Sequence, residues 1–172
     1  ASQTTRFGNI ILSSYESQLD GEISKQFAAM VFSLEKDYHF IGFRGTDDNL
    51  AGWKEDLQMS FKDEIQSQKE AVNYTKKAME KYKGEFILGG HSKGGNLSIY
   101  GASHVNEVDF DRILEVYSND GPGFQKEFLH KEGYLRIKDR IISIVPESSI
   151  VGLLMEQSVE RHIVSSKGIT IF

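Results

Sequence analysis

Runs of apolar residues alternate along this chain with stretches of helical periodicity, and the order of these patterns predicts the fold class. Residues 27–34 and 38–43 are both rich in aromatic and aliphatic side chains, and only the polar residues 35–37 separate them. Two such runs joined by a short polar turn predict a β-hairpin. A weaker apolar run at residues 10–12 predicts a short strand, and the polar residues 16–25 read as a loop.

Residues 66–82 carry the clearest helix signal in the chain. Six residues there recur at helical spacing and form one stripe: Ala71, Val72, Thr75, Ala78, Met79 and Tyr82. Lysines and glutamates fill the opposite positions, as on an amphipathic surface helix. Lys83 and Gly84 follow and end the pattern. The spacing therefore predicts a helix that packs one face against the core.

The rest of the chain repeats this alternation of strand and helix. Apolar runs predict strands at residues 85–89, 113–117 and 141–145, and residues 94–104 read as a helix. The less regular expected elements are a helix at 53–59, helical pieces at 126–138 broken near Gly133, a helical turn at 149–155, and β-like runs at 162–165 and 169–172. Strands that alternate with helices predict an α/β fold with a mostly parallel central sheet flanked by helices.

The composition limits the class of protein without identifying a partner. A length of 172 residues predicts one domain over residues 1–172 with a sizeable core. The formal net charge is -5 and no run of lysine or arginine occurs, which argues against nucleic acid as a partner. The chain has no cysteine, which excludes disulfides, thiolate metal sites and a cysteine nucleophile.

No pattern in the sequence predicts a membrane segment, a metal site or a cofactor. No apolar run reaches the roughly 18 residues of a membrane-spanning helix, and no signal peptide is visible, which favours a cytoplasmic location without stable membrane insertion. The acidic residues Asp47, Asp48, Glu55 and Asp56 lack EF-hand spacing. The chain begins at Ala1 rather than methionine, so we expect it to be incomplete at one or both ends.

The most informative stretch is Gly90-His91-Ser92-Lys93-Gly94, which lies between an expected strand and an expected helix. A G-x-S-x-G sequence in this context is typical of a nucleophile elbow, in which the serine hydroxyl projects clear of the sheet. Gly90 and Gly94 are expected there because a Cβ atom would collide with the crowded turn. Ser92 is therefore a candidate nucleophile. The alternative is a glycine-rich connection with an inert serine.

A serine nucleophile also needs oxyanion donors and an acid that orients its base. In an elbow of this kind one donor is the backbone N–H after the nucleophile, here Lys93, and the second comes from the loop after an earlier strand, where Thr46 lies. Asp120 follows the next expected strand and is the candidate acid, with Glu147, one strand later, as its rival. The other interpretation of Asp120 is a turn aspartate that accepts backbone hydrogen bonds.

The base is expected to be a histidine that follows the acid in the chain. His162 has roughly the right place in this order, although it lies near the start of an expected β-run. A catalytic histidine normally lies on a loop after the final strand, so the base is either His162 or a histidine beyond Phe172.

Two segments together resemble the class 3 lipases. Phe43-Arg44-Gly45-Thr46 followed by Trp53-Lys54-Glu55-Asp56-Leu57 resembles the F-R-G-[ST]…W…D-L signature of those enzymes, and residues 90–95 resemble their G-H-S-x-G-G elbow. The resemblance implies that Ser92 is the nucleophile and that Thr46 supplies an oxyanion contact. A closer similarity is to an uncharacterised bacterial family of lipase-like α/β-hydrolases, through F-R-G-T-D-D, G-G-H-S-K-G-G-N-L, N-D-G-P-G-F and I-V-P-x-S-S-I-V-G.

The chain departs from these patterns at two places. Class 3 lipases carry the triad acid in a D-x-V-P-like segment, whereas Pro146 and Glu147 stand there without an aspartate, which favours Asp120 as a relocated acid. The bacterial family continues past K-G-I into a Q-H-D segment, whereas Ile169 is followed by residues 170–172.

The resemblance implies an α/β-hydrolase fold and a serine hydrolase that cleaves a carboxylic ester, either a small molecule or a lipid, through an acyl-enzyme. It implies no cofactor. The same constellation serves thioesterases, peptidases and acyltransferases, so these activities stay open. A chain of this fold without a usable base would instead be a non-catalytic binding module.

Overall fold

A single sheet forms the centre of the computed structural model, which describes residues 4–5, 7–22, 25–46 and 58–165. Its seven strands lie in the order β1-β2-β3-β4-β5-β6-β7. Strands β1 to β3 pair antiparallel, and each later strand pairs parallel with the one before it. The mostly parallel sheet and its helices confirm the predicted α/β fold.

The strands are β1 (Ile11–Asp20), β2 (Lys25–Glu35), β3 (Tyr38–Phe43), β4 (Glu85–His91), β5 (Ile113–Asn119), β6 (Ile141–Pro146) and β7 (Arg161–Val164). The predicted hairpin is the antiparallel pair β2 and β3. The prediction of a loop at residues 16–25 is wrong, because β1 continues to Asp20. This strand lies at the edge of the sheet with Leu12, Tyr15 and Leu19 exposed, so it lacks the buried alternation that identifies a strand in sequence.

The helices are α2 (Gln66–Lys81), α3 (Lys93–Ser103), α4 (Glu107–Phe110) and α5 (Glu132–Ile137), with 3-10 turns η1 (Phe128–His130), η2 (Lys138–Arg140) and η3 (Val151–Leu153). The two long helices confirm their predictions. The helical pieces expected at 126–138 are η1, α5 and η2, and the interruption falls at Lys131, two residues before Gly133. Helix α4 was not predicted. The expected helix at 53–59 and the run at 169–172 fall largely or wholly outside the described residues.

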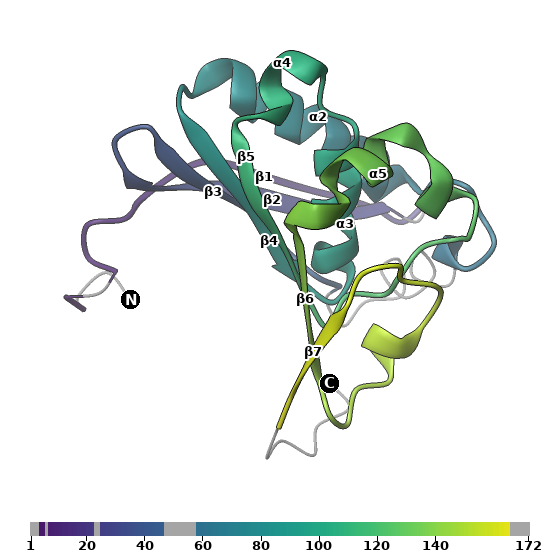
Figure 1. Ribbon diagram of the computed structural model, residues 1–172. Helices are drawn as coiled ribbons and strands as arrows, with labels where there is room; N and C mark the ends of the chain where they lie inside the picture. Colours follow the sequence, from purple (N-terminus) through teal and green to yellow (C-terminus); the bar gives the residue numbers. More distant parts are fainter. Residues whose placement is uncertain (1–3, 6, 23–24, 47–57, 166–172) are drawn as a thin grey trace.

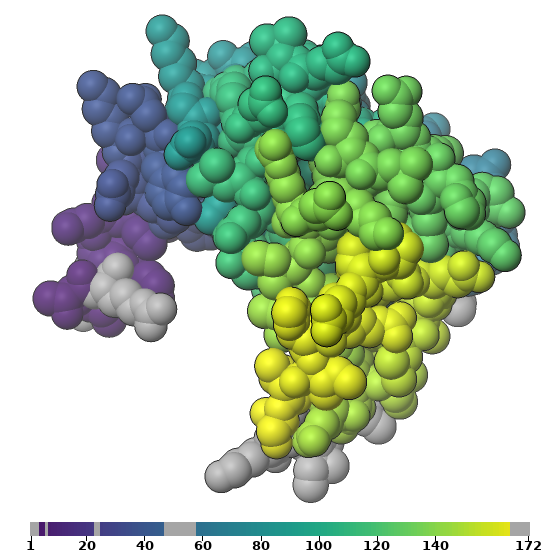
Figure 2. Space-filling model, in the orientation of Figure 1, coloured from purple at the N-terminus to yellow at the C-terminus, as the bar shows by residue number. Residues whose placement is uncertain are grey.

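Helices α2 and α3 lie on the same side of the sheet (Figure 1). Strand residues that face them are fully buried, among them Val31, Ile41 and Leu88. Residues that alternate with these, such as Met30 and Phe40, stay partly exposed on the other face. Figure 2 shows that side hollowed between the amino-terminal and carboxyl-terminal parts of the described chain. The core therefore lies between one face of the sheet and the helices.

The side chain of Arg112 fixes the connection between α2 and the middle of the sheet. Its guanidinium donates to the carbonyl oxygens of Met79 (2.9 Å), Tyr82 (2.5 Å) and Gly84 (2.9 Å). It also lies 5.1 Å from the ring centroid of Phe86, at the start of β4. Carbonyl oxygens at the end of a helix lack partners within the helix. The Arg112 guanidinium supplies hydrogen bonds to those at the end of α2 and so ties this end of the helix to the start of β4.

Two neighbouring buried serines of the sheet make a matched test of hydrogen bonding in this core. Ser118 and Ser143 pair in register on β5 and β6, and each is 1% exposed. The Ser143 hydroxyl donates to Gln157 Oε1 at 3.1 Å, whereas Ser118 Oγ has no partner among the described residues. We expect Ser118→Ala to change the free energy of unfolding by less than about 0.5 kcal/mol, and Ser143→Ala to lower it by about 1 kcal/mol.

Urea denaturation of both variants and the parent checks this pair. Equal losses in the two variants would contradict the assignment of the hydrogen bonds.

Candidate active site

Ser92 stands at a sharp turn between β4 and α3. Its backbone has φ 54° and ψ -128°, a region that residues with a Cβ rarely occupy. A Cβ atom on Gly90 would lie 2.4 Å from the carbonyl carbon of Gly94 and 2.5 Å from the oxygen of Phe43. Only glycine allows this approach, so the turn has the geometry that the G-x-S-x-G pattern predicts.

The segment after β3 lies directly against this turn. A Cβ atom on Gly45 would lie 2.7 Å from the oxygen of His91 and 3.5 Å from Ser92 Cβ. Arg44 continues the pairing with β2, because its N–H donates to the oxygen of Ala28 at 2.9 Å. The structure therefore brings Gly45, the residue before Thr46, beside Ser92.

Lys93 is the first residue of α3. The first N–H groups of a helix have no partner within the helix and point toward its amino end. The Lys93 N–H is thus a donor at the amino end of α3, immediately beside the side chain of Ser92.

Asp120 leaves β5 next to the place where Ser92 leaves β4. The Ser92 N–H donates to the oxygen of Asn119 at 2.9 Å, and Asp120 has the same φ of 54° as Ser92. Asp120 Oδ1 accepts hydrogen bonds from the Ser149 hydroxyl and from the N–H of Gly152 (3.0 Å). Its other oxygen, Oδ2, has no hydrogen-bond partner in the part of the chain that the structure describes. One side of the carboxylate is therefore held and the other is open.

A buried pair of amides holds the turn after Asp120 against α3. The Asn96 amide donates to the oxygen of Gly123 at 2.8 Å, and its own oxygen accepts from Gln68 Nε2 at 2.9 Å. Gln68 Oε1 in turn accepts from the N–H of Ile65 at 3.0 Å. Sequence reasoning missed these supporting residues. The only signal was that Asn96 and Ser149 fall within the motifs G-G-N-L and S-S-I-V-G.

Glu147, the rival acid, follows β6. Its side chain is exposed and its backbone N–H donates to the oxygen of Val164 at 3.0 Å. No hydrogen bond or ion pair is formed by its carboxylate within the described residues. Unlike Asp120, it is not fixed in orientation.

His162 lies within β7 and its side chain is exposed. In the parallel sheet, His91 on β4 pairs with Asn119 on β5, which pairs with Ile144 on β6. Ile144 in turn pairs with His162 on β7. Neighbouring strands are about 4.8 Å apart, so three spacings separate the Cα atoms of His91 and His162 by about 14 Å. The structure does not bring His162 to Ser92.

The other histidines are also apart from Ser92 or turned away from it. His39 lies between Tyr82 and Phe86 and bonds the Ser33 hydroxyl and the Lys83 oxygen. His104 bonds the Tyr100 oxygen at the far end of α3, and His91 and His130 are exposed. Within the described ranges, no imidazole forms a hydrogen bond with the Ser92 hydroxyl.

A small pocket lies beside Asn96, one helical turn along α3 from Ser92. Its lining is mixed, with the polar residues Lys62 and Gln68 beside the apolar Phe124 and Phe128. Burial, and to a lesser extent the hydrogen bond to Glu64, raise the pKa of the Tyr100 phenol above its usual range, so it stays a neutral donor.

Two further features are absent from the described part of the chain. No cluster of three or more acidic or histidine side chains there could hold a metal ion. None of the described helices has the length and apolar character of a membrane span.

Comparison with solved structures places this fold among lipases. A fungal lipase solved with an inhibitor is 17% identical, with a TM-score of 0.58 over 83% of this chain and 60% of the lipase. The Rhizomucor miehei lipase–propeptide complex is 17% identical, with a TM-score of 0.62 over 92% of this chain and 58% of the lipase. M37 lipase is 14% identical, with a TM-score of 0.56 over 80% of this chain and 54% of the lipase. The chain thus spans 54% to 60% of the length of these lipases. This likeness shows a lipase-like α/β-hydrolase fold.

Comparison of sequences gives the family. Among curated proteins none matches the chain. The model of the Mbeg1-like family matches residues 1–172, which is the whole sequence. The chain therefore belongs to the Mbeg1-like family.

Proposed function

We propose that this chain carries the nucleophile and oxyanion hole of a serine hydrolase that cleaves carboxylic esters. The observation that carries the proposal is the backbone of Ser92, held at φ 54° and ψ -128° between a parallel strand and a helix. Strain of this kind costs about 1–3 kcal/mol and clusters at functional sites. The lipase neighbours share the fold and support an ester of a small molecule or a lipid as the substrate.

In this proposal Ser92 Oγ attacks the carbonyl carbon of the ester and passes its proton to an imidazole. The N–H groups of Lys93 and Thr46 donate to the oxygen that becomes negative, which is the largest electrostatic contribution in such reactions. Collapse of the intermediate breaks the C–O bond, and the imidazole returns the proton to the leaving alcohol. Water then attacks the acyl-enzyme in the same way, and the acid product leaves with Ser92 restored.

Asp120 is the proposed acid that orients the imidazole. Because Ser149 and Gly152 hold Oδ1, the carboxylate has a fixed direction and Oδ2 can accept an N–H from the base. The base itself is either His162, on chain order, or a histidine outside the described residues. The position of His162 within β7 disfavours it, since three strand spacings separate it from the end of β4.

An alternative function follows from the positions of the described histidines. No described imidazole reaches Ser92, which favours a non-catalytic module that uses the hydrolase fold to bind a ligand. Thioesterase, peptidase and acyltransferase activities share the proposed mechanism and differ only in the leaving group. The experiments below separate a reactive Ser92 from an inert one.

A fluorophosphonate probe tests the nucleophile. We expect the wild-type chain to gain one phosphonyl adduct, because the activated Ser92 hydroxyl displaces fluoride from phosphorus. Intact-mass measurement detects the adduct, and peptide mapping assigns it to Ser92. Ser92→Ala is expected to gain none.

Two controls accompany the labelling. Ser118→Ala, which changes a buried serine beneath α3, keeps full labelling, and heat-denatured wild type loses it. A wild-type chain that stays unlabelled would favour the binding module instead.

Paired substitutions decide between the two carboxylates. Asp120→Asn keeps an oxygen for Ser149 and Gly152 but no longer stabilises an imidazolium, and such a change costs up to about 10⁴-fold in kcat. We expect Asp120→Asn to lower the rate of p-nitrophenyl ester hydrolysis by at least about 100-fold. Glu147→Gln is expected to leave the rate unchanged. The opposite result would make Glu147 the acid.

A further inference from the structure

The carboxylate of Asp120 is held by a short turn from another part of the chain. Its Oδ1 accepts from the hydroxyl of Ser149 and from the N–H of Gly152, and this N–H lies 3.0 Å from both Oδ1 and Ser149 Oγ. Because Ser149 Oγ accepts the Gly152 N–H, its own single proton is the one directed at the carboxylate. A hydrogen bond from a hydroxyl to a charged carboxylate is shorter and stronger than one between neutral groups.

The end of β6 fixes the backbone of Ser149 relative to that of Asp120. The Asp120 N–H donates to the oxygen of Ile144 at 2.7 Å, and the Ser149 N–H donates to the oxygen of Pro146 at 3.0 Å. Both acceptors belong to β6, so one strand end holds both backbones. A substitution that removes only the Ser149 hydroxyl is therefore expected to leave this turn in place.

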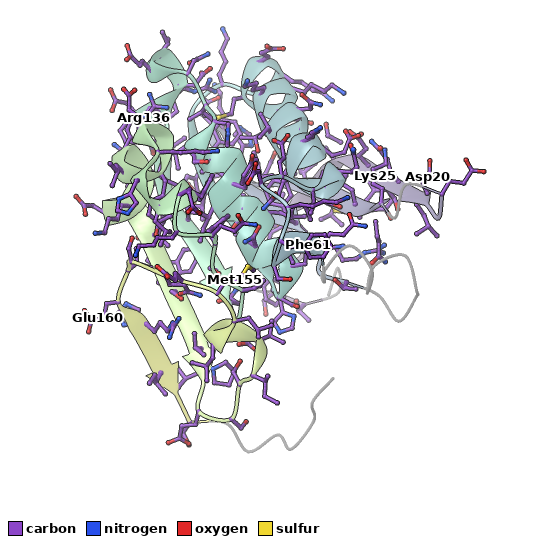
Figure 3. All side chains as sticks on the ribbon, turned by 90° about the vertical axis from the view of Figure 1, so that its right-hand side faces the viewer. Asp20, Lys25, Phe61, Arg136, Met155 and Glu160 are labelled. Carbon is purple, nitrogen blue, oxygen red and sulfur yellow. The ribbon has the colours of Figure 1, made fainter. Side chains whose placement is uncertain are left out.

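The segment between η3 and β7 holds the other side of this contact. Met155 and Glu160, both labelled in Figure 3, mark its course. Within it, Gln157 Nε2 donates to the oxygen of Gly121 at 3.0 Å and to the oxygen of Gly152 at 3.4 Å. One amide thus ties the turn after the acid to the residue that donates to its carboxylate.

We propose that Ser149 is a positioning residue that sets the direction of the Asp120 carboxylate. With the hydroxyl in place, two donors hold Oδ1, so Oδ2 has one direction in which to accept the N–H of the base. Without it, the Gly152 N–H alone holds the carboxylate, which can then turn about its Cβ–Cγ bond. The inference rests on the proposed function, in which Asp120 is the acid, and adds to it the residue that orients the acid.

The test begins with Ser149→Ala in the full chain. We expect kcat for a p-nitrophenyl ester to fall by about 10- to 100-fold, because misplacement of a group by about 1 Å can cost about 100-fold. KM is expected to change by less than about twofold, since the imidazolium that Asp120 stabilises forms only in the transition state.

The same substitution in an Asp120→Ala background separates positioning from folding. With no carboxylate to hold, loss of the Ser149 hydroxyl is expected to change the remaining rate by less than about twofold. A merely structural role would instead lower the rate by the same factor in both backgrounds. The rate of fluorophosphonate labelling of Ser92 follows the slow variants, because it needs the same activated hydroxyl.

Ser148→Ala is the matched control. Ser148 directly precedes Ser149, is exposed, and its hydroxyl forms no hydrogen bond within the described residues. We expect its kcat and KM to match wild type. Ser149→Thr keeps a hydroxyl on this partly exposed residue and is expected to retain most of the kcat that Ser149→Ala loses.

Ser149→Cys covers the case in which Ser149→Ala does not fold. A thiol fills a similar volume but is a weak donor, so kcat is expected to fall in the wild-type background and not in Asp120→Ala. If the folded Ser149 variants turn over like wild type, or lose the same factor in both backgrounds, the inference is wrong while the proposed function stands. A wild-type chain that neither labels nor turns over overturns both.

Discussion

The close approach of α3 to the end of β3 is the constraint on which the rest of this site depends. A Cβ atom on Gly94 would lie 2.3 Å from the oxygen of Phe43, which is inside van der Waals contact with backbone that cannot turn away. Glycine at position 94 therefore allows α3 to start one residue after Ser92 while its first turn lies against the end of β3. That contact places the first N–H groups of α3, the Ser92 hydroxyl and the segment after β3 in one small volume.

The packing of α3 offsets the strain of this turn. Every residue of the helix is buried, and its apolar side chains Leu97, Ile99 and Tyr100 belong to the main core. Burial of such side chains contributes about 1.5–3 kcal/mol each, which exceeds the cost of one strained backbone residue. The Asn96 amide extends this stability to the turn after Asp120. The core thus holds both strained residues, Ser92 and Asp120, in place.

How far the sequence predicts this arrangement depends on whether the signal is local. The elbow, the loop of Thr46 and the long helix at 66–82 follow from residues close together in the chain, and the structure has all three features where expected. The full length of β1 was not predicted, because its apolar residues Leu12, Tyr15 and Leu19 are exposed at the edge of the sheet and show no buried alternation. The Asn96 and Ser149 contacts join segments far apart in sequence, so no local pattern indicates them.

The register of the sheet limits where a base for Ser92 can approach. Residues in register on parallel strands project from the same face, so His162 shares the face of His91 and points away from α3. Ser92 and Asp120 instead turn out of the ends of β4 and β5. A single imidazole that contacts both Ser92 Oγ and Asp120 Oδ2 must lie above those strand ends, because its two nitrogens are close together. The base is therefore expected on a segment that crosses this edge, rather than within the sheet.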